Sequence, residues 1–356
     1  MNSPASDSAP VFVVGTGRSG TTLLRMMLNA HPRIYLTHEA SFYLSTAGIS
    51  IETSLADWLD YYSRTPSFAW LRLSPARIQN QLPAGARCDQ WPLAFQALMR
   101  EKAGQYQKPR YGDKTPLHGL YLGRILEDFD SPRIIHVVRD PRGAVASLLR
   151  MPWAPSSAYL NALYCDQQVK AVLAQADHLH ELRLEDLLAD PKGTMSGVLQ
   201  FIGEDWDDAV LDHARHAPAD DMPPFPWFAG ARRNLGVSTG APAWQEQLSP
   251  AWIRIIEEIC SLTMERYKYP RADLPREASS VRRACARLGE GRKIASSLRR
   301  LRRLARMYAN QKTPDPQVGM EALLNINPKA WSLYPGFSIP DLPQINRRDR
   351  VPRSCP

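Results

Sequence analysis

The 356-residue sequence has few cysteines and no long apolar run. A membrane-spanning helix needs about 20 mainly apolar residues, and we find no such stretch. Residues 1–10 are polar and contain no apolar signal core, so we also expect no secretion signal. The cysteines are odd in number and lack the spacing of metal ligands: Cys88, Cys165, Cys260, Cys285 and Cys355. We therefore expect a cytoplasmic protein with reduced thiols.

A glycine-rich loop near the N-terminus lacks the lysine of nucleotide triphosphatases. Residues 15–22 read Gly-Thr-Gly-Arg-Ser-Gly-Thr-Thr, between the apolar run Val11–Val14 and the helical pattern Leu23–Leu28. The triphosphatase pattern requires lysine where this chain has Thr21, and the cationic residue here is Arg18. Glycines let backbone N–H groups turn toward one anion, and a helix N-terminus adds positive charge. The loop predicts a phosphate-like ligand and argues against kinases and ATPases.

A second informative stretch is Arg133–Arg150, which reads RIIHVVRDPRGAVASLLR. Its apolar part, Ile134–Val138, is typical of a strand buried on both faces of a parallel sheet, and Pro141 marks the start of a helix. Arg139 leaves this strand at its carboxyl end, where open α/β sheets bind ligands. Ser147 follows about two helical turns later, so both side chains can reach one phosphate. The alternative is an arginine at the sheet edge and a solvent-facing serine.

Together these stretches resemble the sulfotransferases that use 3′-phosphoadenosine 5′-phosphosulfate (PAPS). The likeness is nearest to the tyrosylprotein branch and its bacterial relatives, in RSGTTLLRMMLNAHP (Arg18–Pro32) and VRDPRGAVAS (Val138–Ser147). Two more matches occur in the family's order: Glu39 after a strand at Ile34–Thr37, and a lysine-containing turn at Gly112–Pro116. The resemblance implies an α/β fold, with a P-loop type parallel sheet flanked by helices.

The resemblance also implies the residues of a donor site. Loop amides and Arg18 would hold the 5′-phosphosulfate, while Arg139 and Ser147 would hold the 3′-phosphate. The implied donor-binding residues are Gly17, Arg18, Ser19, Gly20, Thr21, Thr22, Arg139 and Ser147. Glu39 would be the base for the attacking hydroxyl, and Lys114 with Arg18 would neutralise charge during transfer. Such transfers depend on positioning and electrostatics, so we expect no metal.

Each of these residues also has a structural interpretation. Glu39 can form an ion pair at the sheet edge, and Lys114 can lie in a surface turn. His136 is an alternative base, although its place in a buried run favours a hydrogen-bonded core residue. Asp140 is expected to cap the helix that follows it. Arg25, on the first helix, either pairs with Glu39 or is structural.

The acceptor is not specified by the sequence. In the tyrosylprotein branch a basic residue two positions after the catalytic glutamate helps to hold acidic peptides, and this chain has Ser41 there. The family's tyrosine before the pair Glu185–Asp186 is replaced by Leu184. A sugar, a lipid-linked alcohol, a natural-product hydroxyl and a tyrosyl hydroxyl therefore all remain candidate acceptors. A P-loop kinase-like phosphotransferase and a PAPS-binding protein without turnover are the alternative functions.

Positive charge is concentrated toward the C-terminus. The chain has a formal net charge of +8, yet residues 271–356 contain 18 Lys and Arg against 7 Asp and Glu. We therefore predict a sulfotransferase domain, residues 1–270, and a C-terminal extension, residues 271–356. Residues 50–110 form a helical insertion near the acceptor side, whose aromatic rings should mainly pack in the core. The extension has apolar residues at helical spacing over 294–308, with arginines on the other face.

The extension is not covered by the resemblance. After Gln311 it becomes rich in proline and aromatic residues, which predicts an extended segment lying over a protein surface. We expect the basic helix to dock on the enzyme's own core or on a second subunit. Peripheral contact with the inner membrane surface is the alternative, and no nucleic-acid partner is expected. Just before the extension, residues 248–267 predict one amphipathic helix that closes the domain.

Overall fold

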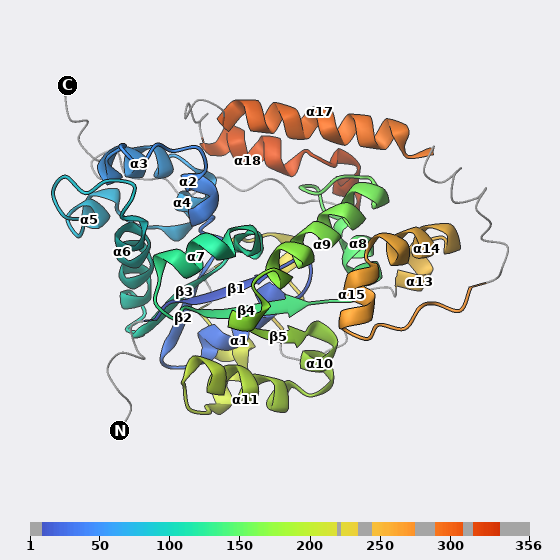
Figure 1. The fold of residues 1–356 in the computed structure, drawn as a ribbon, viewed down its shortest axis with the longest axis horizontal. Coiled ribbons are helices and arrows are strands. Elements are labelled where there is room, and N and C mark those ends of the chain that lie inside the picture. The colour runs from blue at the N-terminus through green and yellow to red at the C-terminus, as the bar shows by residue number, and fades with distance from the viewer. Residues whose placement is uncertain (1–8, 219–221, 234–243, 275–288, 309–315, 335–356) are drawn as a thin grey trace.

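A parallel β-sheet forms the centre of the molecule (Figure 1). The structure is a computed structural model that describes residues 9–218, 222–233, 244–274, 289–308 and 316–334. Within these residues the sheet has five strands, in the order β2-β3-β1-β4-β5, and every pairing is parallel. The strands are β1 (Val11–Gly15), β2 (Ile34–His38), β3 (Arg110–Lys114), β4 (Arg133–Val138) and β5 (Leu179–Arg183). The predicted α/β fold is confirmed.

Helices cover both faces of the sheet. In β1, Val11 and Val13 join one hydrophobic cluster, whereas Phe12 and Val14 join another. Because successive side chains of a strand point to opposite faces, an all-apolar strand must be covered on both sides. The helices on the first face are α1 (Thr21–Ala30), α10 (Leu184–Ala189) and α11 (Pro191–Ile202). Those on the second face are α6 (Trp91–Gly104), α7 (Leu122–Asp128) and α9 (Ala158–Leu173), with the 3-10 helix η2 (Pro116–Tyr121).

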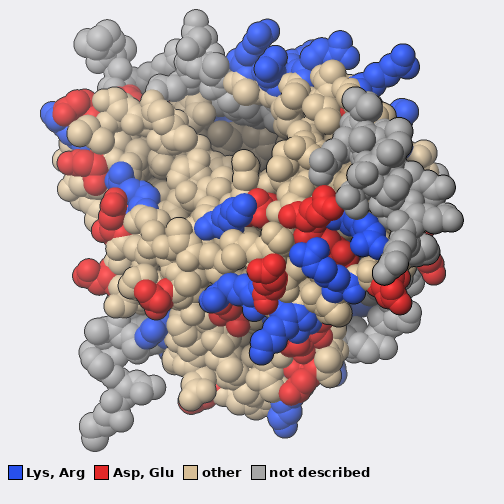
Figure 2. All heavy atoms as spheres, turned by 45° about the vertical axis from the view of Figure 1, so that its right-hand side comes forward, with Lys and Arg blue, Asp and Glu red and all other residues tan. Residues whose placement is uncertain are grey.

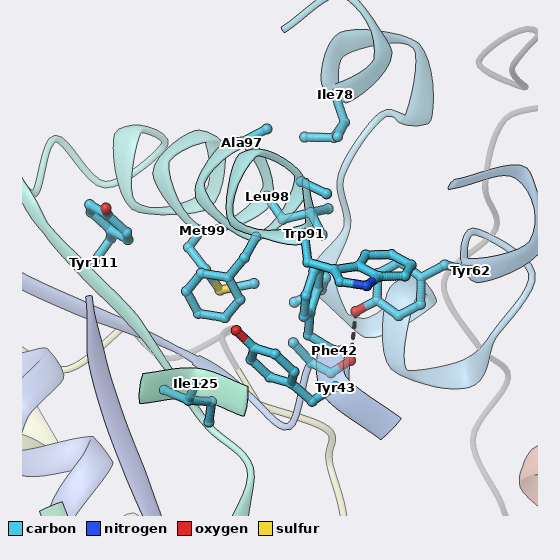
Figure 3. Packing of buried hydrophobic residues seen from close by; sticks show 14 of the residues in the cluster. Phe42, Tyr43, Tyr62, Ile78, Trp91, Ala97, Leu98, Met99, Tyr111 and Ile125 are labelled. Carbon is cyan, nitrogen blue, oxygen red and sulfur yellow. Dashed lines mark hydrogen bonds between the residues drawn. The ribbon is translucent and has the colours of Figure 1, made fainter. Parts of the chain in front are cut away.

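The predicted insertion at residues 50–110 is largely helical. After α2 (Phe42–Thr46), it contains α3 (Leu55–Tyr62), α4 (Pro66–Leu71), α5 (Pro75–Gln79) and α6. Most of its rings are buried, as expected: Trp58, Tyr62, Phe68, Trp91 and Phe95. Figure 3 shows Tyr62 and Trp91 beside Phe42 of α2. The Tyr62 hydroxyl donates a hydrogen bond to the carbonyl of Ala40, so this cluster is tied to the turn that follows β2.

The predicted turn at Gly112–Pro116 is wrong, because most of it is the end of strand β3. This strand lies between β2 and β1, and all its residues are buried. Charged residues are rarely buried without partners, so their presence favoured a surface turn. Here each charge has a partner: Arg110 pairs with Glu204 at 3.0 Å, and Asp113 and Lys114 are also bound by polar side chains.

Helices after β4 complete the core. They are α8 (Pro141–Leu148), η3 (Ala176–His178), η4 (Asp208–Val210), α12 (His213–His216), η5 (Pro226–Phe228), α13 (Trp244–Gln247), α14 (Pro250–Ile259) and α15 (Ser261–Arg266). The single helix predicted at 248–267 is wrong, since α14 and α15 are separate. The break is at Cys260, whose φ of −95° and ψ of 27° are not helical. Its buried thiol donates to the carbonyl of Ala162, a distant contact that no local pattern reveals.

The extension folds against the rest of the chain. It contains α17 (Gly291–Tyr308), α18 (Pro316–Leu324) and the 3-10 helix η7 (Pro328–Leu333), and α18 contacts both α4 and α17. The prediction of an extended segment is thus wrong for residues 316–333, which are largely helical. The prediction also used residues after 334, including Phe337, and these lie outside the residues that the structure describes.

Most arginines of α17 face solvent along the top of the molecule in Figure 2, whereas Arg300 is partly buried and donates to the carbonyl of Ile326. Four of them surround a shallow depression: Arg299, Arg302, Arg303 and Arg306. Their contact with a membrane surface, and the domain boundary at residue 270, stay predictions. None of the helices in the described ranges combines the length and the apolar character needed to cross a membrane.

The Arg110–Glu204 pair offers a test of the strand that the sequence failed to reveal. The two side chains are 0% and 3% exposed, so Glu204→Ala leaves a buried guanidinium without this carboxylate. We expect the free energy of unfolding to fall by about 3–5 kcal/mol in urea titrations. The control is Glu101→Ala, which breaks a pair with the 73% exposed Arg77 and should cost at most about 1 kcal/mol. Equal losses in the two variants would contradict a buried β3.

Candidate functional site

The predicted site residues lie at one edge of the sheet. The loop of residues 16–20 follows β1, Glu39 follows β2, Lys114 ends β3 and Arg139 follows β4. The carboxyl ends of parallel strands meet at the same edge, and open α/β sheets bind ligands there. The fold therefore gathers residues that are more than 120 positions apart in sequence.

The loop after β1 presents the N-terminus of α1 without a side-chain cap. Gly20 is the N-cap residue, with φ of 99°, and no side chain accepts from the first turn. The left-handed backbone favours glycine here, and a Cβ atom would also lie 2.5 Å from the Leu184 side chain, which would have to move. The Ser19 hydroxyl donates to the carbonyl of Thr16, and Thr21 is buried, whereas Thr22 is partly exposed. The uncapped N–H groups of α1 can therefore receive an anion.

Arg18 connects the two predicted halves of the donor site. Its Nε donates to Ser147 Oγ at 3.0 Å, and the Arg139 guanidinium donates to the Arg18 carbonyl at 2.9 Å. Burial, helped by the charges of Arg139 and Arg150, lowers the pKa of Arg18 to about 10, so it stays charged at neutral pH. Because the charge of Arg139 lowers the pKa of Arg18, the two guanidinium groups repel each other, and a bound anion would relieve that repulsion.

Glu39 and Lys114 form an ion pair beside this loop. Lys114 Nζ lies 2.6 Å from Glu39 Oε1; the lysine side chain is fully buried, while the glutamate is 43% exposed. Burial lowers the pKa of Lys114, and the carboxylate of Glu39 opposes that shift. The Glu39 carboxylate partly opposes the lowering of the Arg18 pKa, so the two groups lie within electrostatic reach of each other. The site thus joins a solvent-accessible carboxylate to two buried or partly buried cations.

The turn that carries Glu39 is strained and held by β3. Glu39 has φ of 51°, a left-handed conformation that costs a non-glycine residue about 1–3 kcal/mol. Its N–H donates to the Lys114 carbonyl at 2.8 Å, and the next N–H, of Ala40, donates to Asp113 Oδ1 at 3.0 Å. The Thr37 hydroxyl also donates to Asp113 Oδ1, at 2.5 Å. Asp113 is therefore a positioning residue that the sequence interpretation missed.

Three of the structural alternatives can be compared with the geometry. His136 is buried in β4 with Nδ1 3.4 Å from Glu181 Oε1, so its expected place in the core is confirmed. Asp140 accepts a hydrogen bond from the second residue of α8, which confirms the predicted cap. Arg25 is fully buried and donates to the carbonyl of Leu36 at 2.8 Å, a contact that joins α1 to β2.

His38 lies next to Glu39 but is poorly suited to proton transfer. Its ring is buried and meets the edge of Phe228, with centroids 4.9 Å apart. Burial, together with the charge of Lys114, holds the pKa of His38 well below its usual range. The ring is therefore neutral near pH 7 and belongs to the apolar wall beside the ion pair.

Two aromatic residues at the site, Tyr164 and Tyr334, were not expected there from the sequence, whereas the loop that carries Trp227 was expected near the nucleotide or acceptor. The Tyr164 hydroxyl, on α9, accepts from the Gly17 N–H at 3.3 Å, and the Trp227 carbonyl accepts from Arg18 at 3.4 Å. Tyr334 lies close enough to Arg18 for the two groups to shift each other's pKa. The sequence feature that could have indicated Trp227 and Tyr334 is the high aromatic content near residue 227 and after residue 311.

This geometry can be compared with known proteins. A family model described as "Sulfotransferase family" matches residues 10–208, more than half of the chain. The chain belongs to the sulfotransferase family. The match covers β1 to β5 and all the predicted site residues, but it ends before the extension.

Curated relatives include protein-tyrosine sulfotransferases. The chain is 26% identical over 219 residues to protein-tyrosine sulfotransferase 2 of Gallus gallus, which covers 57% of this chain and 53% of that protein. The protein-tyrosine sulfotransferase of Drosophila melanogaster is 27% identical over 213 residues, which cover 57% of this chain and 40% of that protein. An uncharacterized protein of Aquifex aeolicus is 24% identical over 229 residues, which cover 57% of this chain and 26% of that protein. The sulfotransferase thus spans about half or less of these relatives' length.

A solved structure agrees on the fold. The sulfotransferase domain from the Synechococcus PCC 7002 olefin synthase superposes with a TM-score of 0.54 at 20% identity. The superposition covers 75% of this chain and 96% of that domain. It therefore supports the α/β architecture independently of the short motifs.

The ion pair predicts a specific dependence of stability on pH. Without the carboxylate, the buried Lys114 ammonium loses a partner, so Glu39→Gln should destabilise by on the order of 1–3 kcal/mol near pH 7. The substitution also lowers the pKa of Lys114 further, so in the folded variant the lysine loses its proton at a lower pH than in the wild type. The loss should accordingly shrink at about pH 9.5, as measured by urea unfolding.

A double-mutant cycle provides the control for this prediction. In a Lys114→Met background no buried ammonium is present, so adding Glu39→Gln should have little effect at either pH. A loss that is equally large in both backgrounds would show that the pair does not stabilise Lys114.

Proposed function

We propose that the chain transfers a sulfuryl group from PAPS to an acceptor hydroxyl. The observation that carries this proposal is the meeting, at one sheet edge, of three features: an uncapped helix N-terminus, the interacting arginines Arg18 and Arg139, and an exposed carboxylate paired with a buried lysine. Membership of the sulfotransferase family supports the chemistry. The names of the relatives support a protein hydroxyl as one acceptor class, but Ser41 removes the basic residue expected to hold acidic peptides.

The donor would bind along the loop after β1. Backbone N–H groups of Gly17–Thr22 and the guanidinium of Arg18 would hold the 5′-phosphosulfate, whereas Arg139 and Ser147 would hold the 3′-phosphate. The hydrogen bond from Arg18 to Ser147 supports this assignment. It brings a residue assigned to the 5′-phosphosulfate into contact with a residue assigned to the 3′-phosphate. PAPS supplies the sulfuryl group, and the chain's own residues supply position and charge.

Glu39 and Lys114 would carry the chemistry. The acceptor oxygen forms a bond to sulfur while the bond from sulfur to the phosphate oxygen breaks, and Glu39 accepts the hydroxyl proton. Lys114 has three N–H donors, so it can hold Glu39 with one and the departing phosphate oxygen with another. A correctly placed base contributes about 10²- to 10⁴-fold in rate. The 43% exposure of Glu39 supports its access to an acceptor.

The alternative of a kinase-like phosphotransferase has less support. The lysine position of triphosphatase loops is occupied here by Thr21, whose side chain carries no positive charge, and the family match is to sulfotransferases. Stabilisation against heat by adenosine 3′,5′-bisphosphate, without a comparable effect of ATP and Mg²⁺, would favour the sulfotransferase proposal. The opposite pattern would favour the kinase.

The 3′-phosphate assignment predicts a selective loss of affinity. Arg139→Ala removes a charge-assisted contact worth about 1.5–3 kcal/mol. In calorimetric titrations the variant should lose about ten- to a hundredfold in affinity for adenosine 3′,5′-bisphosphate. It should lose little affinity for 5′-AMP, which has no 3′-phosphate. Equal losses for the two ligands would contradict the role of Arg139.

The role of Glu39 predicts a separation of binding from turnover. Glu39→Gln should bind adenosine 3′,5′-bisphosphate with near wild-type affinity while transfer from labelled PAPS to phenolic, sugar and peptide acceptors falls by about two to four orders of magnitude. Arg18→Ala is the contrasting variant, because it should impair both binding and transfer. If the Glu39→Gln enzyme retains turnover, the glutamate has a structural role and is not the base.

A further inference from the structure

The turn that carries Glu39 leads into a helix whose own residues do not cap it. Glu39 and Ser41 both have left-handed backbone conformations, with φ of 51° and 52°. Ser41 is the N-cap residue of α2, yet its side chain accepts no hydrogen bond from the helix. Such conformations persist only where surrounding contacts hold them, and the first N–H groups of a helix need acceptors. The turn and the start of α2 therefore depend on acceptors from another part of the chain.

The acceptors come from one segment, residues 113–118, at the end of β3 and the start of η2. Beyond β3, Thr115 Oγ1 accepts from the Ser41 N–H at 3.1 Å. Three residues later, His118 Nε2 accepts from the Tyr43 N–H at 3.3 Å. With the two hydrogen bonds that β3 accepts, the segment receives four N–H groups from the turn and the helix start.

Asp113 determines which nitrogen of His118 can accept. The ring accepts from Tyr43 only if Nε2 carries no proton, so the ring proton must be on Nδ1. Nδ1 lies 3.2 Å from Asp113 Oδ2, in an electrostatic contact between two fully buried side chains. Burial acts to raise the pKa of Asp113, but the contact with His118 and those with two threonine hydroxyls outweigh it, so the pKa lies below its usual range. A charged carboxylate beside Nδ1 favours the tautomer that leaves Nε2 as the acceptor.

The same segment also holds the side chain of Glu39. Lys114 Nζ lies 2.6 Å from the carboxylate, while the neighbours of Lys114 hold the backbone of the turn. The His118 ring is fixed in turn by edge-on contacts with Phe12 of β1 and with Tyr43, at centroid distances of 6.2 and 5.4 Å. The position of the carboxylate relative to the lysine is therefore set by one short segment that is packed against the central strand.

We propose that Thr115 and His118 are positioning residues for Glu39. The inference rests on the proposed sulfotransferase function, in which Glu39 is the base. The two side chains are 3% and 0% exposed, and they act through the N–H groups of Ser41 and Tyr43 rather than on the acceptor. A reacting group that is misplaced by about 1 Å can lose about a hundredfold in rate. Loss of either acceptor should therefore lower turnover much more than donor binding.

The first test compares two substitutions of Thr115. Thr115→Val removes the hydroxyl but keeps the shape of the side chain, whereas Thr115→Ser keeps the hydroxyl. The measurement is kcat for transfer from labelled PAPS to the phenolic, sugar or peptide acceptor on which the wild type is most active. Thr115→Val should lower kcat by about ten- to a hundredfold while its affinity for adenosine 3′,5′-bisphosphate stays within about twofold of wild type. Thr115→Ser should restore most of the rate.

The second test concerns His118. His118→Phe keeps an aromatic ring but removes both nitrogens, so kcat should again fall by about ten- to a hundredfold. His118→Gln retains a side-chain acceptor and should lose less. The matched control is His136→Phe, which replaces a 1% exposed histidine that faces a carboxylate, Glu181, in β4. Because His136 makes no listed contact with the turn, this variant should keep kcat within about twofold of wild type.

A double-mutant cycle separates positioning from general damage to the fold. A residue that acts through the base has no further effect on the rate once the base is removed. Thr115→Val combined with Glu39→Gln should therefore turn over at the rate of Glu39→Gln alone. A further loss in the double variant would show that Thr115 acts by another route, and it would overturn the inference.

The remaining outcomes distinguish the inference from the function on which it rests. If the wild type transfers the sulfuryl group but Thr115→Val and His118→Phe retain its kcat, or lose bisphosphate affinity as much as kcat, the positioning role is wrong and the sulfotransferase proposal stands. If His118→Phe does not fold, the Thr115 variants and the double-mutant cycle decide. A wild type that transfers nothing from PAPS to any of the acceptors refutes the proposed function and this inference with it.

Discussion

The burial of Lys114 is the constraint on which the candidate site depends. A charged ammonium inside a protein needs a partner, and at the end of β3 the carboxylate that pairs with it is that of Glu39. To reach it, the chain after β2 adopts a left-handed turn, and that turn is held by hydrogen bonds to β3 itself. The same contacts that satisfy a buried charge therefore expose a carboxylate at the sheet edge. Stability and the geometry of the proposed base have one physical origin.

The donor side has the opposite electrostatic character. Arg18 and Arg139 are held together by a hydrogen bond to a backbone carbonyl, and the helix N-terminus beside them has no side-chain cap. Each feature is unfavourable alone, because it leaves positive charge or N–H groups without a matched anion. In the proposed donor site, these features would hold a phosphate without rearrangement, which would limit reorganisation during transfer.

Local patterns were sufficient for the parts of the fold that are contiguous in sequence. The loop around Arg18 and the segment from Arg139 to Ser147 were predicted because each combines an apolar strand, a turn and a helix start within about twenty residues. Strand β3 was missed because its charges are satisfied by residues far away, such as Glu204 for Arg110. Tyr334 was missed for the same reason: its significance depends on Trp227, more than a hundred positions earlier. Long-range partners are not encoded in a local pattern.

The extension shows why composition alone does not define a functional unit. Net charge changes sharply after residue 270, but charge is mainly a property of surfaces, and it says little about which segments share a core. Met320 and Leu324 of α18 belong to the same hydrophobic cluster as Val145 of α8 and Ile253 of α14. Removing apolar residues from such a cluster leaves a cavity in the domain that carries the site. The arginines of α17 therefore mark the outer face of a segment whose inner neighbour, α18, packs into the sulfotransferase core.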